Sequence, residues 1–216
     1  MKSGIGAGTL MRWCLAAIVS WAFVAGAVAS PGDGIAQLKQ FVADAASAQG
    51  RFEQVVTASS GRRPQRASGH FAFVRPGQFR WVYETPYTQV LVSDGQRLWA
   101  WDEDLNQVTV KRLGDALGST PAAILAGDGA LERDFELSEA GHADGLAWVI
   151  ALPRQSDSTF EAMRVGLADG MLRRMELRDH FGQTTVIDFE DVVTGAAPDP
   201  ALFSFTPPPG ADVIGD

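Results

Sequence analysis

The chain has 216 residues, a formal net charge of −8 and a single cysteine, Cys14. An acidic chain is repelled by phosphate backbones and by anionic lipid surfaces, so nucleic acid is a poor candidate partner and permanent residence on a membrane is not expected. One cysteine forms no intramolecular disulfide and no thiolate zinc site, so the fold must be held together by packing.

The first 29 residues have the pattern of a cleaved secretory signal peptide. Lys2 and Arg12 supply positive charge, an apolar run covers residues 13–28, and Ala27-Val28-Ala29 forms an A-x-A cleavage pattern. The run is too short, and wrongly flanked, for a stable membrane anchor, although a retained anchor is the alternative. We therefore expect cleavage after residue 29 and export to the periplasm.

Cleavage would leave residues 30–216 as one domain without cysteine, and it would change the net charge from −8 to −10 because Lys2 and Arg12 are lost. Arg12 and Trp13 precede Cys14, where a lipid-modified cysteine needs small and apolar residues. The chain is therefore not expected to be a lipoprotein itself.

One amphipathic helix of about three turns is predicted next, followed by many strands. Apolar residues recur at helical spacing at Ile35, Leu38, Phe41, Val42 and Ala45, and Gly50 is expected to end the helix. Alternating patterns then predict strands at 51–56, 70–75, 79–84, 89–92, 97–101, 107–113, 135–137, 146–152, 160–167, 171–178 and 184–193. Asp-Gly pairs at 94–95, 144–145 and 169–170 favour tight hairpins.

A short helix interrupts the strands. Ser119-Thr120-Pro121 combines a capping residue with Pro at the first helical position, Ala122 to Ala126 continue the helix, and Gly127 ends it. A two-turn helix between runs of strands suggests a lid or plug. The elements together predict a mainly β fold of the α+β type, an antiparallel meander whose sheet must curl or close to bury its apolar face.

No pattern of enzyme chemistry is found. His70, His142 and His180 do not have metal-ligand spacing, and the chain lacks a G-x-S-x-G nucleophile elbow and a Gly-rich phosphate loop. The carboxylate pairs, such as Asp102 with Asp104, fall in turns or at strand ends. We expect no catalytic residue, no metal site and no cofactor.

Aromatic residues are instead concentrated on the predicted strands, at Phe71, Phe73, Phe79, Trp81, Tyr83, Trp99 and Trp101. They could form an ordinary β core, or together line a concave apolar pocket for a lipid or another small molecule. Because each buried methylene contributes about 0.8 kcal/mol, an acyl chain brings on the order of 10 kcal/mol of unfavourable hydration into water. A carrier for such chains needs a pocket that closes and is only weakly latched.

The chain resembles the outer-membrane lipoprotein carrier family, LolA. The resemblance rests on the segments Val74-Arg75-Pro76-Gly77-Gln78-Phe79-Arg80-Trp81, Leu91-Val92-Ser93-Asp94-Gly95, Leu98-Trp99, Asp104-Leu105-Asn106-Gln107-Val108-Thr109-Val110, Thr120-Pro121 and Phe203-Ser204-Phe205-Thr206-Pro207-Pro208. It implies an incomplete, half-open antiparallel β-barrel with a helical lid over a hydrophobic cavity. It also implies a monomeric periplasmic carrier that accepts acylated lipoproteins from an ATP-driven inner-membrane release complex and delivers them to an outer-membrane receptor.

The resemblance also implies residue roles. Arg75 matches the family arginine that holds the lid shut by hydrogen bonds to lid carbonyls. An arginine in line with Phe71 and Phe73 on a strand would also point toward the apolar side. The alternative is that Arg75 extends to water at the end of its strand. Phe79 matches a residue implicated in handing cargo over. Trp81 and Leu91 are assigned to the cavity wall. Trp99, one of the aromatic residues named above, is expected to line the cavity as well. Ile124 and Leu125 are expected to face the cavity from the lid, or to be ordinary helix-to-sheet packing.

Two other functions remain open. A related lid-and-sheet protein could bind a different envelope lipid, or sense envelope stress, without passing cargo to a receptor. A lipid-modifying enzyme is a distant third, because it requires a catalytic constellation that the sequence lacks. Lipid still attached to protein after purification would favour lipoprotein carriage, and free lipid would favour the alternative.

Overall fold

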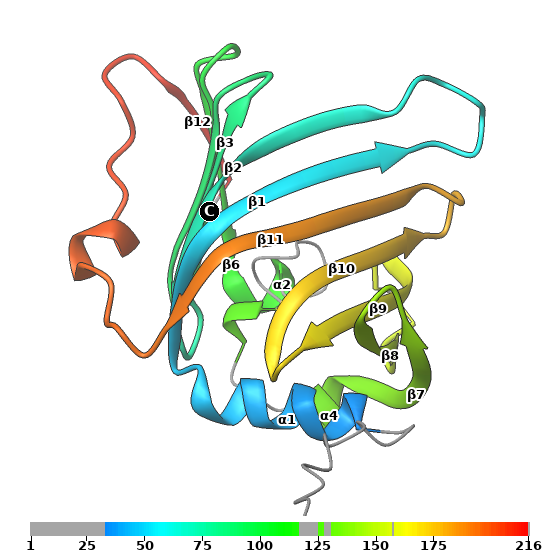
Figure 1. The fold of residues 1–216 in the computed structure, drawn as a ribbon. Coiled ribbons are helices and arrows are strands. Elements are labelled where there is room, and N and C mark those ends of the chain that lie inside the picture. The colour runs from blue at the N-terminus through cyan, green and yellow to red at the C-terminus, as the bar shows by residue number, and fades with distance from the viewer. Residues whose placement is uncertain (1–32, 117–124, 128–130, 157, 216) are drawn as a thin grey trace, which may run out of the picture.

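The computed structural model describes residues 33–116, 125–127, 131–156 and 158–215, so the predicted signal peptide lies outside the described residues (Figure 1). The strands are β1 (Ser47–Thr57), β2 (Gln65–Val74), β3 (Gln78–Thr85), β4 (Gln89–Asp94), β5 (Arg97–Asp102), β6 (Gln107–Arg112), β7 (Phe135–Ala143), β8 (Leu146–Pro153), β9 (Phe160–Ala168), β10 (Met171–Asp179), β11 (Thr184–Thr194) and β12 (Asp212–Gly215). The helices are α1 (Gly34–Asp44), α2 (Leu113–Ala116), α4 (Leu131–Asp134) and the 3-10 helix η1 (Pro200–Phe203).

All twelve strands belong to one sheet, in the order β12-β6-β5-β4-β3-β2-β1-β11-β10-β9-β8-β7. Two antiparallel meanders, β2 to β6 and β7 to β11, lie on either side of β1, which pairs with both β2 and β11. The predicted meander is confirmed, and each predicted strand overlaps one of β1 to β11. The last strand, β12, was not predicted, and it pairs with β6 in parallel.

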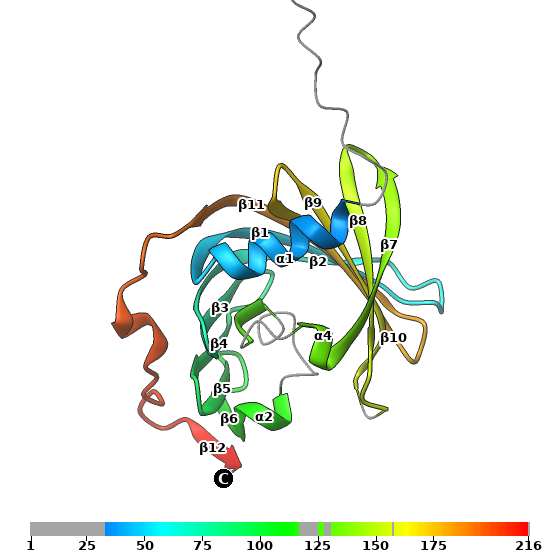
Figure 2. The same cartoon turned by 90° about the horizontal axis from the view of Figure 1, so that it is seen from below.

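The sheet curls strongly, and α1 lies across one end of it (Figures 1 and 2). The first and last strands of the sheet order, β12 and β7, do not pair with each other, so the sheet keeps two edges. Helix α1 packs against the β7 to β10 side of the sheet, where α4 also contacts β7. None of the described helices is both long and apolar enough to span a bilayer.

Helix α1 matches its predicted face but not its predicted end. Leu38 and Phe41 are buried toward the sheet, and the Ala45 N–H closes the helix on the Phe41 carbonyl. The prediction that Gly50 ends the helix is wrong, because β1 already begins at Ser47. Gly50 lies inside that strand, at a register shift against β11, where a Cβ atom would come within 2.8 Å of the Glu190 carbonyl oxygen. The glycine therefore marks a bulge that lets two strands approach.

Hairpins form at all three predicted Asp-Gly pairs, but only two of the pairs have a positive φ at both residues, since at 94–95 φ is positive at Gly95 alone. In the β7–β8 turn φ is 54° at Asp144 and 77° at Gly145, and in the β9–β10 turn it is 52° at Asp169 and 71° at Gly170. Two consecutive positive φ values are the signature of a type I′ turn, whose twist suits antiparallel strands and which Asp-Gly tolerates better than other pairs. These local choices set the strand order of the second meander.

The face of the sheet toward α1, called the inner face, carries an aromatic cluster of Phe52, Phe71, Phe73, Trp81 and Phe189, all buried. The Phe52 and Trp81 ring centroids are 4.3 Å apart, and those of Phe71 and Trp81 are 5.6 Å apart. Phe71 also meets Phe189 edge-on at 5.5 Å. Because the inner face is continuous across β1, β2, β3 and β11, these rings form one rigid wall.

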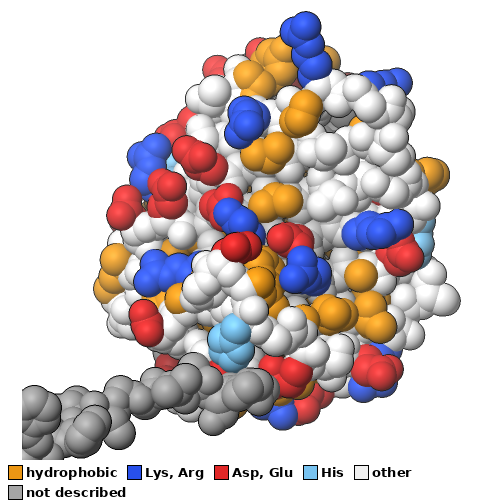
Figure 3. Space-filling model, turned by 45° about the vertical axis from the view of Figure 1, so that its right-hand side comes forward, with side chains coloured by type: hydrophobic (Ala, Val, Ile, Leu, Met, Phe, Trp, Pro, Cys, Tyr) orange, Lys and Arg blue, Asp and Glu red, His pale blue; other side chains and the backbone are white. Residues whose placement is uncertain are grey.

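The opposite, outer face is covered in two different ways. Over β3 to β5, the C-terminal segment places Phe205 on Val82, Val90, Val92 and Trp101. Over β9 to β11, cross-strand ion pairs join Arg164 to Glu176, Arg174 to Asp188 and Arg178 to Glu161, and Figure 3 shows charges of both signs with hydrophobic side chains between them. Exposed pairs of this kind contribute little to stability, and they keep this face solvated.

Candidate functional site

A narrow apolar cavity lies between α1 and the sheet. Its wall is formed by α1, by β7 to β10, by α4 and by residues at 75 and 125: Leu38, Phe41, Val42, Arg75, Leu125, Leu131, Leu137, Ala151, Met163, Val165, Leu172 and Met175. Arg75 is the only charged side chain among them. Such a lining suits an apolar ligand, and the flexible thioethers of Met163 and Met175 suit one of variable shape.

The cavity is small in this conformation. Only about 20 Å³ is open to the centre of a water-sized sphere, which is room for about one water molecule and not for an acyl chain. Protein interiors are packed too densely to yield around a guest by small adjustments. A larger ligand therefore requires that α1 or the segment around Leu125 move away from the sheet.

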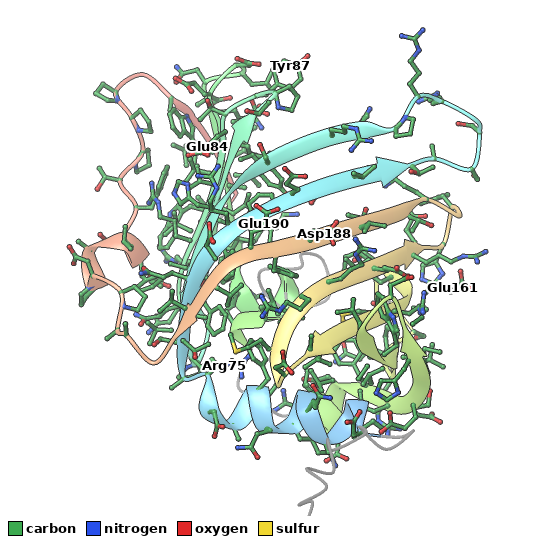
Figure 4. The ribbon with its side chains drawn as sticks, viewed as in Figure 1. Arg75, Glu84, Tyr87, Glu161, Asp188 and Glu190 are labelled. Carbon is green, nitrogen blue, oxygen red and sulfur yellow. The ribbon has the colours of Figure 1, made fainter. Side chains whose placement is uncertain are left out.

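Arg75, directly after β2, joins those two segments. Its Nε donates a hydrogen bond to the Leu125 carbonyl at 3.0 Å, and its Nη1 donates to the Val42 carbonyl on α1 at 2.8 Å. Figure 4 shows Arg75 beside the C-terminal end of α1. One guanidinium thus connects the sheet both to α1 and to the segment of Leu125.

The surroundings of Arg75 are two aromatic rings and a largely apolar wall. Its guanidinium carbon lies 5.1 Å from the ring centroid of Phe73 and 5.9 Å from that of Phe41. Burial lowers the pKa of Arg75 to about 10, so the group remains charged at neutral pH. A buried charge needs acceptors, and each hydrogen bond to a charged group contributes about 1.5–3 kcal/mol, partly offset by desolvation.

Backbone contacts at the same place reinforce the closure. The Arg75 N–H donates to the Ala46 carbonyl at 2.8 Å, and the Gly77 N–H donates to the Ala126 carbonyl at 2.6 Å. The segment of Leu125 and Ala126 is helical, and both side chains are buried. The end of β2 and the turn after it therefore form a common seat for α1 and for residues 125–126.

The other end of α1 is held by the edge strand β7. The Glu139 carboxylate accepts the N–H of Gly34 at 3.1 Å and that of Ile35 at 3.0 Å, and His142 lies 3.1 Å from Asp33. A carboxylate at a helix N-terminus satisfies unpaired N–H groups and interacts favourably with the helix dipole. Helix α1 is therefore fastened at both ends, by Glu139 at its start and by Arg75 at its end.

Replacing Glu139 with Ala should loosen the start of α1 alone. A carboxylate at a helix N-terminus contributes on the order of 1 kcal/mol, so the Gly34 and Ile35 amides should exchange with solvent about fivefold faster. Residue-resolved hydrogen exchange measures this directly. Glu136→Ala, an exposed position on the same strand, is the matched control and should leave both amides unchanged. Equal exchange in the two variants would contradict the anchoring role.

Of the predicted site residues, Arg75 and Leu125 line the cavity. Phe71, Phe73, Phe79 and Trp81 belong to the same buried core as several lining residues, but they are not among the lining residues themselves. Leu91 packs against this core from β4. Leu125 lines the cavity, whereas Ile124 lies outside the described residues.

Trp99 lies on the outer face, away from the cavity. It pairs with Val92 across β4 and β5, and its ring is 6.4 Å from that of Phe205. Strand side chains alternate between faces, and the neighbouring Leu98 takes the inner position on β5. The C-terminal segment covers Trp99, a contact that strand periodicity alone does not reveal.

The residues that sequence reasoning missed come from α1 and from β7 to β10. Leu38 and Phe41 were identified only as the apolar side of a helix, and Met163, Leu172 and Met175 only as strand positions. Their alternation does predict one buried face per strand. The alternation does not show which strands face α1. The packing of α1 on particular strands decides which apolar residues line the cavity. Among the described residues, no group of three or more His, Cys, Asp or Glu side chains could hold a metal ion.

Comparisons with known proteins agree with this geometry. A family model described as "Outer membrane lipoprotein carrier protein LolA" matches residues 43–206. The outer-membrane lipoprotein carrier protein of Dechloromonas aromatica is 47% identical over 180 residues, 83% of this chain and 86% of that protein. That of Methylococcus capsulatus is 43% identical over 199 residues, 92% of this chain and 94% of that protein.

Two solved structures share the fold at low identity. A LolA superfamily protein from Nitrosomonas europaea superimposes with a TM-score of 0.50 and 12% identity, covering 80% of this chain and 97% of its own. An uncharacterized conserved protein from Thermus thermophilus gives a TM-score of 0.51 and 11% identity, covering 84% and 96%. At these identities the likeness concerns the fold alone.

Proposed function

The chain belongs to the LolA family of outer-membrane lipoprotein carrier proteins, and from this premise we propose how its own residues hold and release the cargo. Carriers of this family act in the periplasm, bind lipoproteins and catalyse no reaction. The proposed mature carrier is a single domain, residues 30–216, released by cleavage of the signal peptide. Its curled sheet acts as a half-open barrel, with α1 and the helical segment around Leu125 as the lid.

The acyl chains of the cargo enter between the lid and the inner face. Each methylene transferred from water to an apolar wall contributes about 0.8 kcal/mol, so even a partly filled cavity outweighs a latch of a few hydrogen bonds. The aromatic cluster and Phe79 then serve as the rigid back wall, Leu91 extends that wall, and Ile124 and Leu125 cover the chains from the lid. The cavity lining is apolar and the space inside it is small, which supports a site that widens around its ligand.

The observation that carries this proposal is the double contact of Arg75 with Val42 and Leu125 at the edge of an apolar cavity. The latch stabilises the empty, closed carrier, so it opposes cargo binding and favours release. A carrier needs this balance because it must bind acyl chains more strongly than water does and less strongly than its destination does. Arg75 sets that balance.

The proposed partners follow from the route of the cargo. An ATP-driven release complex in the inner membrane would load the carrier, and a receptor in the outer membrane would unload it. We propose that the carrier works as a monomer.

Release of a newly made lipoprotein from inner-membrane spheroplasts tests this function. Purified mature carrier should bring the lipoprotein into the soluble fraction as a complex of one carrier and one cargo. Leu38→Gln, which places an amide on the cavity wall, should recover less than about a tenth of that cargo. Lys39→Gln is the matched control on the same helix, since Lys39 is exposed and forms an ion pair with the exposed Glu132, outside the cavity wall.

One result would contradict the proposal that the protein carries lipoproteins. If the native protein releases no lipoprotein but binds free lipid well, the chain handles an envelope lipid without passing on protein cargo. Circular dichroism of Leu38→Gln checks that its helix and sheet remain, so that lost release is not mistaken for lost folding.

A further inference from the structure

Two hairpin tips project together from the end of the sheet away from α1 (Figure 1). One tip, residues 58–64, joins β1 to β2, and the other, residues 180–183, joins β10 to β11. Ser59 donates its hydroxyl to the Phe181 carbonyl at 3.1 Å, and Thr57 pairs with Thr184 at the base of the tips. They therefore form one protrusion.

The first tip is basic although the chain as a whole is acidic. Residues 54–83 contain no Asp or Glu in a chain whose net charge is −8. Arg62, Arg63 and Arg66 are exposed on the tip and the adjoining start of β2, and within the described part of the chain none of them forms an ion pair. In the second tip and its base, residues 178–184, the one carboxylate is Asp179, which accepts the N–H groups of Phe181 and Gln183.

Phe181 lies in the β10–β11 tip of the protrusion. Its side chain is 88% exposed, more than any other large hydrophobic side chain among the described residues. An isolated exposed apolar residue is unremarkable by itself, but here it stands beside three cations on a narrow projection. An aromatic ring flanked by arginines is the composition of segments that rest in the interface of a bilayer.

The shape favours a lipid surface over a protein partner. A specific protein interface usually buries about 800 Å² on each side, which needs a broad complementary surface. Two hairpin tips offer a narrow point, and neighbouring β9 to β11 present paired, solvated charges. A bilayer interface accepts a single inserted ring, and anionic lipids attract each nearby Arg by about 1 kcal/mol.

We propose that the two hairpin tips dock transiently on an anionic lipid surface, with Phe181 in the interface and Arg62, Arg63 and Arg66 against the lipid phosphates. One ring and three cations give weak, salt-sensitive binding, and the negative charge of the rest of the chain opposes lasting adsorption. Docking in this orientation leaves α1 and Arg75 pointing away from the bilayer, where protein partners can reach them. The contact would hold the carrier at the membranes between which it travels.

Co-sedimentation with lipid vesicles tests the proposal. The mature carrier should bind vesicles of equal parts phosphatidylglycerol and phosphatidylcholine at low ionic strength, bind phosphatidylcholine vesicles at least about tenfold more weakly, and dissociate as salt is raised. Arg62→Glu with Arg63→Glu should weaken binding to the anionic vesicles at least about tenfold, and Phe181→Ser should weaken it severalfold. Each variant should still release lipoprotein from spheroplasts, because the tips are remote from the cavity.

Matched controls separate the tips from general surface effects. Arg97→Glu changes an exposed arginine at the start of β5, and Leu105→Ser changes an apolar side chain that is 69% exposed in the β5–β6 turn, so neither should alter vesicle binding. Equal binding to neutral and anionic vesicles, or unchanged binding of the tip variants, would overturn the proposal. Normal vesicle binding by the double arginine variant together with impaired delivery to a receptor would point to an acidic protein partner instead.

Discussion

Arg75→Leu should bind lipoprotein cargo at least about tenfold more tightly than the native carrier and should fail to pass it on. In this conformation the native guanidinium donates to the Val42 and Leu125 carbonyls, and under the proposal these hydrogen bonds break when the lid opens around cargo. Leucine removes that stabilisation of the empty state, so cargo no longer displaces a latch when it binds. A net loss of about 1.4 kcal/mol from the closed state corresponds to the tenfold change.

Transfer of cargo from the loaded carrier to outer-membrane vesicles measures the effect, with cargo affinity determined in parallel. Arg75→Lys should have an intermediate phenotype, since an ammonium keeps the charge but lacks the planar fork that reaches two carbonyls. Arg80→Leu is the matched control, because Arg80 contacts the Leu202 carbonyl in the C-terminal segment, remote from the lid. Transfer by Arg75→Leu at the native rate, or refusal of cargo by this variant, would contradict the latch.

Phe71→Ala should lower the free energy of unfolding by about 3–5 kcal/mol, the usual effect of truncating a buried aromatic residue. Phe71 is 4% exposed and touches the rings of Phe73, Trp81 and Phe189. Its removal leaves a hole at the centre of the aromatic cluster, where the strands of the central sheet prevent collapse. The proposed carrier opens and closes over this aromatic cluster, so the substitution would also weaken the fixed side of its cavity.

Urea denaturation followed by tryptophan fluorescence measures the change. Phe181→Ala removes the same side chain from a position that is 88% exposed, and it should change the free energy of unfolding by less than about 0.5 kcal/mol. Similar losses in the two variants would mean that the aromatic cluster contributes no special stability. A fall in the m value of Phe71→Ala would instead indicate a more compact unfolded state or a populated intermediate.

Local chemistry explains which elements could be predicted. The Asp-Gly turns at 144–145 and 169–170 have positive φ at two successive residues, which this pair tolerates. The alternation of Phe79, Trp81 and Tyr83 with Arg80 and Val82 assigns one face of β3 to the core. Helix α1 was visible from its 3.6-residue period. These signals depend on residues that are neighbours in the chain, so no tertiary contact was needed to read them.

Gly50 and β12 show where local signals mislead or are absent. Gly50 sits opposite Glu190, 140 positions along the chain, in a bulge that sequence periodicity cannot distinguish from a helix end. Residues 212–215 have no marked alternation, and they become a strand because β6 offers them an unpaired edge. In both cases a distant backbone decides the local conformation.

The candidate site likewise has features that the sequence indicated and features that only the fold decided. Arg75 beside Pro76, at the end of an aromatic strand, identified a charge that must find acceptors on the apolar side, and the family resemblance suggested which ones. Only the fold brings the Val42 carbonyl to the same guanidinium as that of Leu125, and only the fold turns Trp99 outward under Phe205.

The sequence by itself determined the mainly β class, the position of α1, the Asp-Gly hairpins, the aromatic concentration on β2 and β3, and the place of Arg75 at the end of an aromatic strand. The tertiary structure decided which apolar side chains line the cavity, how closed it is, how Glu139 anchors α1, and that the basic tip meets Phe181. The physical reason is the range of the forces involved. Backbone dihedral preferences and side-chain periodicity act within a few residues, whereas a cavity or a latch depends on the packing of segments that lie far apart in the chain.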